Sequence, residues 1–182
     1  MTSLLLVRHA EPAAGFGDAT DPGLSAAGVA HAAELAERLS LQPRRPIFSS
    51  PLQRARQTAQ PLADQWDVSV AIAPVLRELP SPTTDLAERA EWLGPALGGN
   101  WADLGPDVGA WRRAILDAAV GVEFPQVWFT HFVVMNAVVS AVLGSDRVTV
   151  FRPGHCAVLE LEVVEGEVSI VTTPGDAESA IR

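Results

Sequence analysis

Two short apolar segments of this sequence each lead directly into a histidine. Residues 4–7 (Leu-Leu-Leu-Val) precede Arg8 and His9, and residues 127–130 (Val-Trp-Phe-Thr) precede His131. Short runs of branched apolar residues are typical of buried strands in α/β proteins, which place their ligands outside the carboxyl ends of the strands. We therefore expect both imidazoles to lie at one edge of a sheet, where a neutral ring nitrogen can act as a nucleophile.

Arginines close to these histidines supply the positive charge that an anionic substrate needs. Arg8 adjoins His9, and Arg54 lies in the segment 49–59 (Ser-Ser-Pro-Leu-Gln-Arg-Ala-Arg-Gln-Thr-Ala), within the first turn or so of a predicted helix. The planar guanidinium fork matches phosphate oxygens better than a point charge does. A single histidine at a strand end is more often structural than catalytic. The combination is what predicts a phosphate site with an imidazole nucleophile.

Composition narrows the class of protein. The chain has 182 residues, a hydrophobic content of 48% and a net charge of −9, with no lysine. The length favours one domain over residues 1–182 with a substantial core, and the negative charge argues against nucleic acid as a partner. No apolar run approaches the ~18 residues needed to span a bilayer, so no membrane partner is expected. The lack of a signal-type N-terminus and the single cysteine, Cys156, lead us to expect a cytoplasmic protein.

Strands alternate with helices along most of the chain, which predicts an α/β fold. The last two apolar segments flank Glu165-Gly166 and predict a hairpin. The expected architecture is a three-layer sandwich with a mainly parallel central sheet, helices on both faces and an antiparallel C-terminal edge hairpin. Strands are predicted at 3–8, 46–48, 68–72, 126–130, 157–164 and 167–172, and helices at 25–41, from 51, from about 107 and at 133–143.

Two features of the predicted elements depend on prolines. Ser50 is predicted to cap a helix whose first residue is Pro51, because a proline at that position loses no hydrogen bond. Residues 74–106 are predicted to be irregular because prolines interrupt them, although some of their leucines keep helical spacing. We interpret residues 80–106 as a variable cap or insertion.

The apolar C-terminal hairpin is a candidate edge for a homodimer.

With these segments in view, the sequence resembles the histidine phosphatase superfamily, the phosphoglycerate mutase-like proteins of branch 1. The likeness covers most of the chain and is carried by segments that occur in the family's order. Segment 6–11 resembles the family's Arg-His-Gly opening in its alanine variant, and segment 21–28 resembles the Leu-Ser/Thr-x-x-Gly start of the first helix. Segment 49–59 matches Ser-x-Leu-x-Arg-Ala-x-Gln-Thr-Ala, and segment 129–131 resembles the strand that delivers the second histidine.

The resemblance implies a role for each of the motif residues. His9 is expected to attack phosphorus in line and form phosphohistidine, while Arg8 and Arg54 hold the equatorial oxygens. His131 is expected to donate a further hydrogen bond to the transferring group, and the backbone N–H at Phe132, at a helix start, to help bind phosphate. Because these groups stabilise the developing charge themselves, no metal and no cofactor is expected.

Protonation of the leaving group requires a carboxylic acid that stays neutral in an anion-rich site. In the family a glutamate after the third strand often has this role, and Glu78 matches its position. A bound phosphate dianion raises the pKa of a nearby carboxyl by like-charge repulsion, and the same carboxylate can later activate water. Glu11 is a weaker rival because it lies so close to His9 along the chain.

Two departures from the family's pattern bear on the substrate. Phe132 follows the second histidine where glycine is usual, and its ring is expected to narrow the pocket or favour an apolar substrate. Segment 80–84 lacks the Glu-Arg-His-Tyr-Gly signature and the basic cluster of true mutases, which favours hydrolysis. We therefore predict metal-independent hydrolysis of a small phosphomonoester. The alternatives are a protein phosphohistidine phosphatase of the phosphorelay type and a non-catalytic phosphate-binding regulatory domain.

Other polar residues have simpler interpretations. His31 falls on the polar face of an alanine-rich helix and is expected to be solvated, and Arg56 lies roughly opposite Arg54, at the surface. His155 is interpreted as a turn residue before the last hairpin, with a place in the pocket as the alternative. Cys156 is expected to be a small buried residue in a strand.

Overall fold

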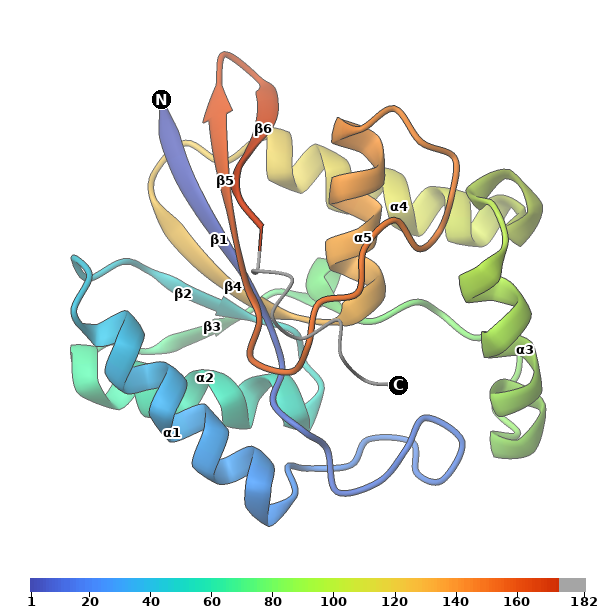
Figure 1. The fold of residues 1–182 in the computed structure, drawn as a ribbon, viewed down its shortest axis with the longest axis horizontal. Coiled ribbons are helices and arrows are strands. Elements are labelled where there is room, and N and C mark those ends of the chain that lie inside the picture. The colour runs from blue at the N-terminus through green and yellow to red at the C-terminus, as the bar shows by residue number, and fades with distance from the viewer. Residues whose placement is uncertain (174–182) are drawn as a thin grey trace.

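The computed structural model describes residues 1–173 and contains one mixed sheet flanked by helices (Figure 1). The six-stranded sheet has the order β3-β2-β4-β1-β5-β6. Strands β3, β2, β4 and β1 are parallel, while β5 runs antiparallel to β1 and β6 antiparallel to β5. This topology confirms the predicted fold class. The strands are β1 (Thr2–Arg8), β2 (Ile47–Ser49), β3 (Val70–Ile72), β4 (Gln126–Thr130), β5 (Val158–Val164) and β6 (Glu167–Thr172).

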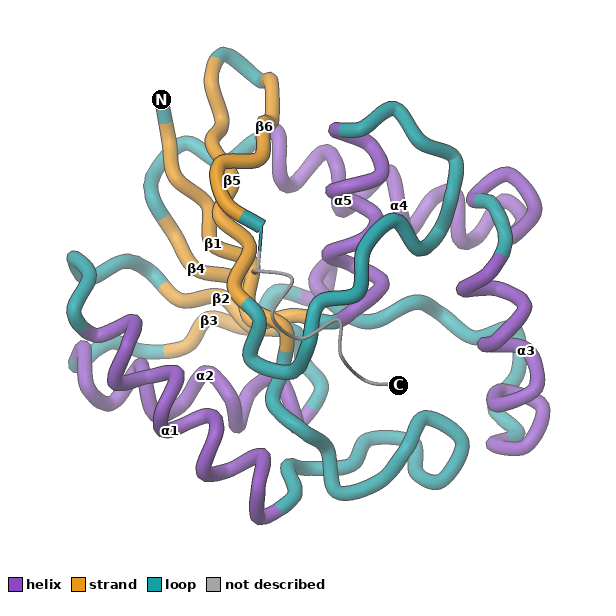
Figure 2. The backbone as a smooth tube through the Cα atoms, in the orientation of Figure 1, coloured by secondary structure: helices purple, strands orange, loops and turns teal. Residues whose placement is uncertain are grey.

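Helices cover both faces of the sheet (Figure 2). α1 and α2 lie on one face, where Leu35 shares a core with Leu5 of β1. α4 and α5 lie on the other face, where Met135 shares a second core with Leu4. Within residues 1–173, no helix is long and apolar enough to cross a membrane. The helices are α1 (Ala26–Ser40), α2 (Gln53–Trp66), α3 (Leu86–Gly98), α4 (Gly105–Val120) and α5 (Phe132–Val142).

Strand β1 is buried on both faces because its side chains alternate between the two cores. Leu5 and Val7 belong to the core under α1 and α2, and Leu4 and Leu6 to the core under α4 and α5. All of these side chains are at most 1% exposed. A strand that is buried on both faces has apolar residues at successive positions of its sequence. Its packing fixes the position of the residue that follows it, His9.

Helix α2 begins later than the sequence predicts. Its first residue is Gln53 and its N-cap is Leu52, which makes no side-chain hydrogen bond, so the prediction of Ser50 as cap and Pro51 as first residue is wrong. The Ser50 hydroxyl instead accepts a hydrogen bond from the Leu52 amide at 3.3 Å and lies 2.7 Å from His131 Nε2. The serine therefore orders the turn beside a strand-end histidine rather than the helix terminus.

The region in which prolines predicted irregular structure contains a complete helix, α3. Asp85 caps this helix by accepting hydrogen bonds from the amides of Ala87 and Glu88. Pro95, expected to break the structure, lies inside the helix and is exposed, so water can satisfy the carbonyl that loses its donor. α3 buries only Ala96 and lies at the margin of the molecule, away from the sheet (Figure 1).

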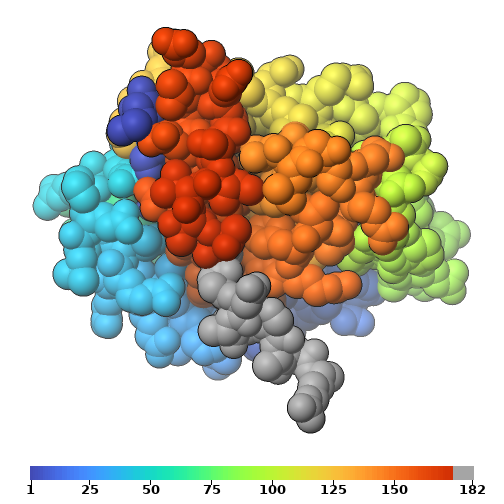
Figure 3. Space-filling view, turned by 45° about the horizontal axis from the view of Figure 1, so that its top comes forward, coloured from blue at the N-terminus to red at the C-terminus, as the bar shows by residue number. Residues whose placement is uncertain are grey.

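The C-terminal strands form the predicted hairpin. Its turn residues, Glu165 and Gly166, both have positive φ, as tight hairpin turns require. Cys156 has a φ of 59° and lies in the turn before β5, not in a strand as predicted. The hairpin forms the red part of the surface in Figure 3, and Val171 on the edge strand β6 is 55% exposed. A homodimer through this edge stays a prediction.

Candidate active site

The two strand-end histidines meet because β1 and β4 are neighbours in register. Arg8 pairs with Thr130 across the two strands, and the His9 amide donates to the Thr130 carbonyl at 2.9 Å. The ring centroids of His9 and His131 lie 5.1 Å apart. His9 is 5% exposed and His131 is 0% exposed. The structure therefore brings together, inside the protein, both histidines that the sequence singles out.

His9 is held with its Nε2 atom facing a guanidinium group. Its Nδ1 atom lies 2.7 Å from the Ala10 carbonyl oxygen, and because a carbonyl only accepts, Nδ1 carries the ring proton. Nε2 then has a lone pair, to which Arg54 Nε donates at 3.2 Å. A neutral imidazole whose reactive nitrogen faces an arginine is arranged to attack a group that the arginine binds.

His9 stays neutral over the physiological pH range. Burial lowers its pKa to about 3, and the positive charges of Arg54 and Arg8 act in the same direction. Burial also takes the pKa of His131 well below its usual range, with His9 and the same arginines adding to the effect. Both rings are therefore imidazoles rather than imidazolium cations near pH 7.

Arg54 projects from the first turn of α2 into the site. Thr58, one turn later, donates to the Arg54 carbonyl at 2.6 Å and accepts from the Ala10 amide at 2.9 Å, which ties α2 to the segment after β1. Asp21 accepts from the Gln53 amide at 2.9 Å and lies 3.9 Å from the Arg54 guanidinium group. These contacts fix the start of α2, and with it the guanidinium group.

Arg8 is oriented by the loop that precedes β5. It donates to the Pro153 carbonyl at 2.7 Å and to His155 Nε2 at 3.3 Å. Its guanidinium carbon lies 5.2 Å from the centroid of the Phe132 ring. His155 lies in a turn and also lines the cavity, so both interpretations of this residue hold. Burial lowers the pKa of His155 to about 4, with the charge of Arg8 adding to the effect.

His131 lies next to His9, with the ring centroids 5.1 Å apart, and is not one of the residues that line the cavity. Its Nε2 atom is 2.7 Å from the Ser50 hydroxyl, and within residues 1–173 its Nδ1 atom has no hydrogen-bond partner. Because the Ser50 oxygen already accepts from the Leu52 amide, its hydroxyl can donate to Nε2, which leaves the ring proton on Nδ1. This leaves a buried N–H group that has no hydrogen-bond partner among the described residues.

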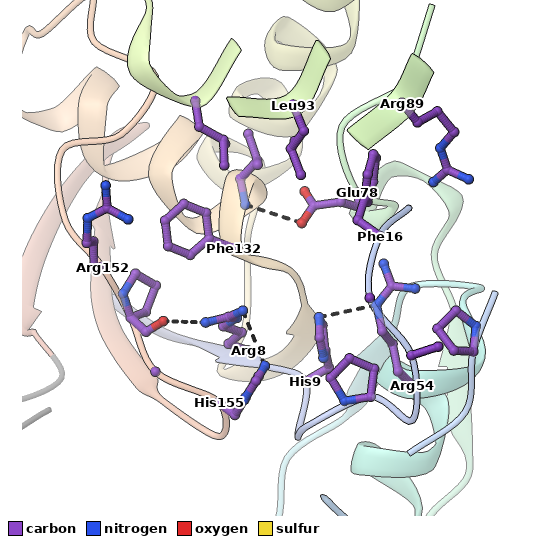
Figure 4. A pocket seen from close by; sticks show the side chains of 18 of the residues that line it. Arg8, His9, Phe16, Arg54, Glu78, Arg89, Leu93, Phe132, Arg152 and His155 are labelled. Atoms are coloured by element: carbon purple, nitrogen blue, oxygen red, sulfur yellow. Dashed lines mark hydrogen bonds between the residues drawn. The ribbon is translucent and has the colours of Figure 1, made fainter. Parts of the chain in front are cut away.

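Glu78 is the one carboxylic acid among the described residues that line the cavity (Figure 4). One carboxylate oxygen accepts from the Leu79 amide at 2.9 Å, and the other faces the Val133 amide at 3.5 Å. Burial raises the pKa of Glu78 against the opposing effect of these amides, so its carboxyl keeps a proton to a higher pH than free glutamate does. Glu11 instead accepts from the Ser25 hydroxyl at 2.6 Å and is not a lining residue.

Most of these side chains, though not those of His131 and Glu11, line one cavity of about 940 Å³ (Figure 4). One end, which we call the arginine end, is formed by Arg8, His9 and Arg54. Glu78 and Phe132 also line the cavity, as the sequence predicts for an acid and for a ring at its rim. Among residues 1–173, no group of three or more His, Cys, Asp or Glu side chains is placed to hold a metal ion.

The cavity has further lining residues that sequence reasoning missed. Arg89 and Leu93 reach it from α3, and Phe16 from the loop after β1 (Figure 4). Phe151 and Arg152 reach it from the loop before β5. None of them lies in a segment that carries the family resemblance. The one available signal was the helical spacing of leucines in α3, which indicates an apolar face but not what that face contacts.

Comparison with known proteins gives one family. The model of the histidine phosphatase superfamily (branch 1) matches residues 4–174. An uncharacterized protein of Mycobacterium tuberculosis, Rv0525, is 30% identical over 125 residues, which are 69% of this chain and 54% of that protein. The chain therefore spans about half the length of the curated relatives that it matches.

Solved structures share the fold. Phosphoserine phosphatase from Entamoeba histolytica, in complex with 3-phosphoglyceric acid, superposes with a TM-score of 0.77 at 21% identity, over 96% of this chain and 98% of that chain. A mycobacterial glucosyl-3-phosphoglycerate phosphatase in complex with inorganic phosphate gives a TM-score of 0.74 at 23% identity, over 96% and 98% of the two chains. At such identities the likeness concerns the fold alone.

Proposed function

The chain belongs to branch 1 of the histidine phosphatase superfamily, and on this premise we propose that it hydrolyses a small phosphomonoester through phosphohistidine at His9, without a metal ion. Family membership supports the assignment as a phosphoric monoester hydrolase. The observation that carries the proposed mechanism is the orientation of His9. Its Nε2 lone pair faces Arg54 at 3.2 Å, while Nδ1 is held by the Ala10 carbonyl.

In the first step the phosphoryl group of the substrate occupies the arginine end. The Arg54 N–H that now faces His9 donates to a phosphoryl oxygen, and Arg8 binds another. His9 Nε2 attacks phosphorus, the Nε2–P bond forms, and the bond from phosphorus to the ester oxygen breaks. The Ala10 carbonyl stabilises the positive charge that develops on the ring, and His131 Nδ1–H donates to the transferring group.

Glu78 serves both steps as acid and then as base. Its protonated carboxyl, favoured by the raised pKa, gives its proton to the departing alkoxide, and the alcohol leaves. The resulting carboxylate accepts a proton from water while the water oxygen attacks phosphorus. The Nε2–P bond then breaks, inorganic phosphate leaves, and His9 and Glu78 return to their starting protonation states.

Hydrolysis of p-nitrophenyl phosphate in EDTA between pH 4 and 8 tests this function. We expect the wild-type protein to release nitrophenol and His9→Ala to fall to the background rate. The matched control is His31→Ala, which removes an exposed histidine of α1 and should keep full activity. Rapid quenching followed by mass spectrometry should detect one added phosphoryl group in the wild type and in His31→Ala, but not in His9→Ala. Retained activity in His9→Ala, or loss of the wild-type activity in EDTA, would contradict the mechanism.

The alternatives predict different outcomes in the same assays. A regulatory domain binds inorganic phosphate in a titration but forms no phosphoenzyme and hydrolyses no ester. A phosphohistidine phosphatase of the phosphorelay type hydrolyses a phosphohistidine peptide faster than any small ester. The proposed function expects the reverse order of rates.

A further inference from the structure

We propose that the cavity beyond the arginine end binds an apolar organic group, so that the substrates are phosphomonoesters of apolar alcohols or phenols. This inference rests on the proposed phosphatase function and adds the substrate class to it. The surface that carries the inference is called the apolar wall. It consists of Phe16, Leu93, Leu97, Phe132, Val150 and Phe151.

The apolar wall is assembled from segments that are far apart in the sequence. Phe16 comes from the loop after β1, Leu93 and Leu97 from α3, Phe132 from the start of α5, and residues 150–151 from the loop before β5. All of these side chains are half-buried, so each keeps apolar surface in contact with solvent. A concave apolar surface beside a few fixed polar groups is the usual composition of a small-molecule site.

This wall is continuous with the arginine end. The Phe132 ring centroid lies 5.2 Å from the guanidinium carbon of Arg8, and Leu93 faces the same part of the cavity as Glu78 in Figure 4. Arg8 and Glu78 are the residues to which we assign phosphate binding and leaving-group protonation. The organic group of an ester bound in this way therefore has the apolar wall as its surroundings.

The two further arginines of the cavity are not organised as a second anion site. The guanidinium group of Arg89 lies over the face of the Phe16 ring, with its carbon atom 4.2 Å from the ring centroid. Arg152 is exposed, and exposed charges are screened by water. Arg8, by contrast, is oriented by the Pro153 carbonyl at 2.7 Å.

The size of the cavity favours a substantial organic group. Its volume of about 940 Å³ is close to the upper end of the range for small-molecule sites, roughly 300–1,000 Å³, so a phosphoryl group fills only a small part. A polar substituent placed against the apolar wall loses water without gaining hydrogen-bond partners. An apolar substituent is stabilised in proportion to the apolar surface area that binding removes from water. The wall therefore selects for carbon rather than for hydroxyl or carboxylate groups.

A series of n-alkyl phosphates from ethyl to octyl tests the inference, because their leaving groups are chemically alike. We expect kcat/KM to rise about two- to fourfold per added methylene until the wall is covered, since one buried methylene contributes up to about fourfold, or about 0.8 kcal/mol. A flat or falling series would overturn the inference. So would faster hydrolysis of an ω-carboxylated hexyl phosphate than of hexyl phosphate, because the wall would then serve an anion.

Variants of α3 link the preference to the wall. Leu93→Asn should lower the ratio of kcat/KM for hexyl over ethyl phosphate by about tenfold. Ala87→Asn introduces asparagine at an exposed position of the same helix and should leave this ratio unchanged. Equal ratios in Leu93→Asn and the wild type would overturn the role of the wall.

Alkylphosphonates separate this inference from the proposed function, because they bind without being hydrolysed. In calorimetric titrations we expect hexylphosphonate to bind at least about tenfold more tightly than ethylphosphonate. If no ester is hydrolysed but this difference in binding is found, the phosphatase function fails and the apolar wall stands. If esters are hydrolysed at rates independent of chain length and both phosphonates bind equally, the function stands and the inference is overturned.

Discussion

His9 and Leu93 line the same cavity, but the regions that carry them are built differently. His9 follows β1, whose residues 4–7 are at most 1% exposed, and its own side chain is 5% exposed. Leu93 lies on α3, in which only Ala96 is buried. The arginine end is thus held by the cores on the two faces of the sheet, whereas Leu93 lies on a helix that buries one residue.

The difference corresponds to what each region does in the proposed reaction. Phosphoryl transfer needs reacting atoms at fixed distances and angles, and close packing around a central strand supplies such rigidity. Apolar contact is non-directional, so a wall that binds a hydrocarbon group needs the right surface but not one fixed geometry. Chemistry and substrate recognition are therefore expected to respond differently to substitution.

The largest effect is expected from a substitution at the arginine end. Arg54→Lys keeps the charge but removes the planar fork and the Nε–H that faces His9 at 3.2 Å, so kcat/KM for p-nitrophenyl phosphate should fall about 10³-fold. Arg56→Lys, on the same helix but exposed, is the matched control and should stay within about twofold. Similar values for both variants would show that fixed guanidinium geometry is not required.

The next largest effect is expected for the acid. Glu78→Gln should lower kcat/KM for ethyl phosphate by about 10²-fold, but much less for p-nitrophenyl phosphate, because kcat/KM reports phosphoryl transfer to His9 and the phenolate leaves without a proton. Because the pKa of Glu78 is raised, the wild-type rate on ethyl phosphate should decline only above the usual range of a glutamate carboxyl, as the proton is lost. This decline should vanish in Glu78→Gln.

The rival acid supplies the control for that experiment. Glu11 accepts a hydrogen bond from Ser25 at the start of α1 and does not line the cavity. Glu11→Gln should therefore leave the shape of the pH profile unchanged. A larger loss in Glu11→Gln than in Glu78→Gln would exchange the two assignments.

The arginine end could be predicted because each of its residues adjoins a local signal. Arg8 and His9 follow an apolar run, and so does His131. The parallel order of β1 and β4 then brings both runs to the same edge of the sheet. Arg54 sits in the first turn of a helix whose sequence resembles a family motif. Local patterns of this kind give both the element and the residue at its end.

Gly28 shows what such a motif encodes. The Gly28 amide donates to the Ser25 hydroxyl at 2.9 Å, which caps α1. A Cβ atom at this position would collide with the Glu11 carbonyl oxygen. The loop after His9 therefore packs closely against Gly28, which has no side chain. This steric requirement can be read from a family motif but not from hydrophobic periodicity.

Apart from Phe132, the apolar wall could not be predicted because it depends on contacts between distant segments. Phe16 and Phe151 become neighbours of one cavity only in the folded chain, and the prolines around α3 concealed the helix itself. Ser50 is a smaller case of the same limit. Its place before Pro51 predicts a helix cap, yet its hydroxyl lies against His131, which is 81 residues away in the chain.

Acid pH should lower the stability of the folded protein through His155, whose pKa is lowered in the folded state. The pKa of His155 is about 4 in the folded protein and about 6.5 in the unfolded chain. Between these values the unfolded chain binds a proton that the folded protein does not, so the free energy of unfolding falls as pH falls. His155→Asn, which can still accept from Arg8, should reduce this slope by at most about 1.4 kcal/mol per pH unit.

Urea unfolding at several pH values between 7 and 4 measures that slope. Ala87→Asn introduces the same side chain at an exposed position and should leave the slope as it is in the wild type. If His155→Asn also leaves the slope unchanged, His155 does not stay neutral in the folded protein. That result would contradict the hydrogen bond that Arg8 donates to His155 Nε2.

The smallest effect is expected on the α3 side of the cavity. Leu93→Ala truncates a half-buried side chain, so the free energy of unfolding should change by less than about 1 kcal/mol. Leu62→Ala truncates a side chain of α2 that is 0% exposed and should cost about 2–5 kcal/mol. Urea unfolding followed by circular dichroism measures both values.

This pair of variants isolates burial, because each substitution removes the same atoms from a helix and the change in helix propensity is the same for both. A loss in Leu93→Ala as large as in Leu62→Ala would mean that α3 is packed like the core, and that its leucines serve the fold. A small loss of stability, together with a reduced preference for long alkyl phosphates, would instead place the contribution of Leu93 in binding. The apolar wall would then be a surface that only a bound organic group completes.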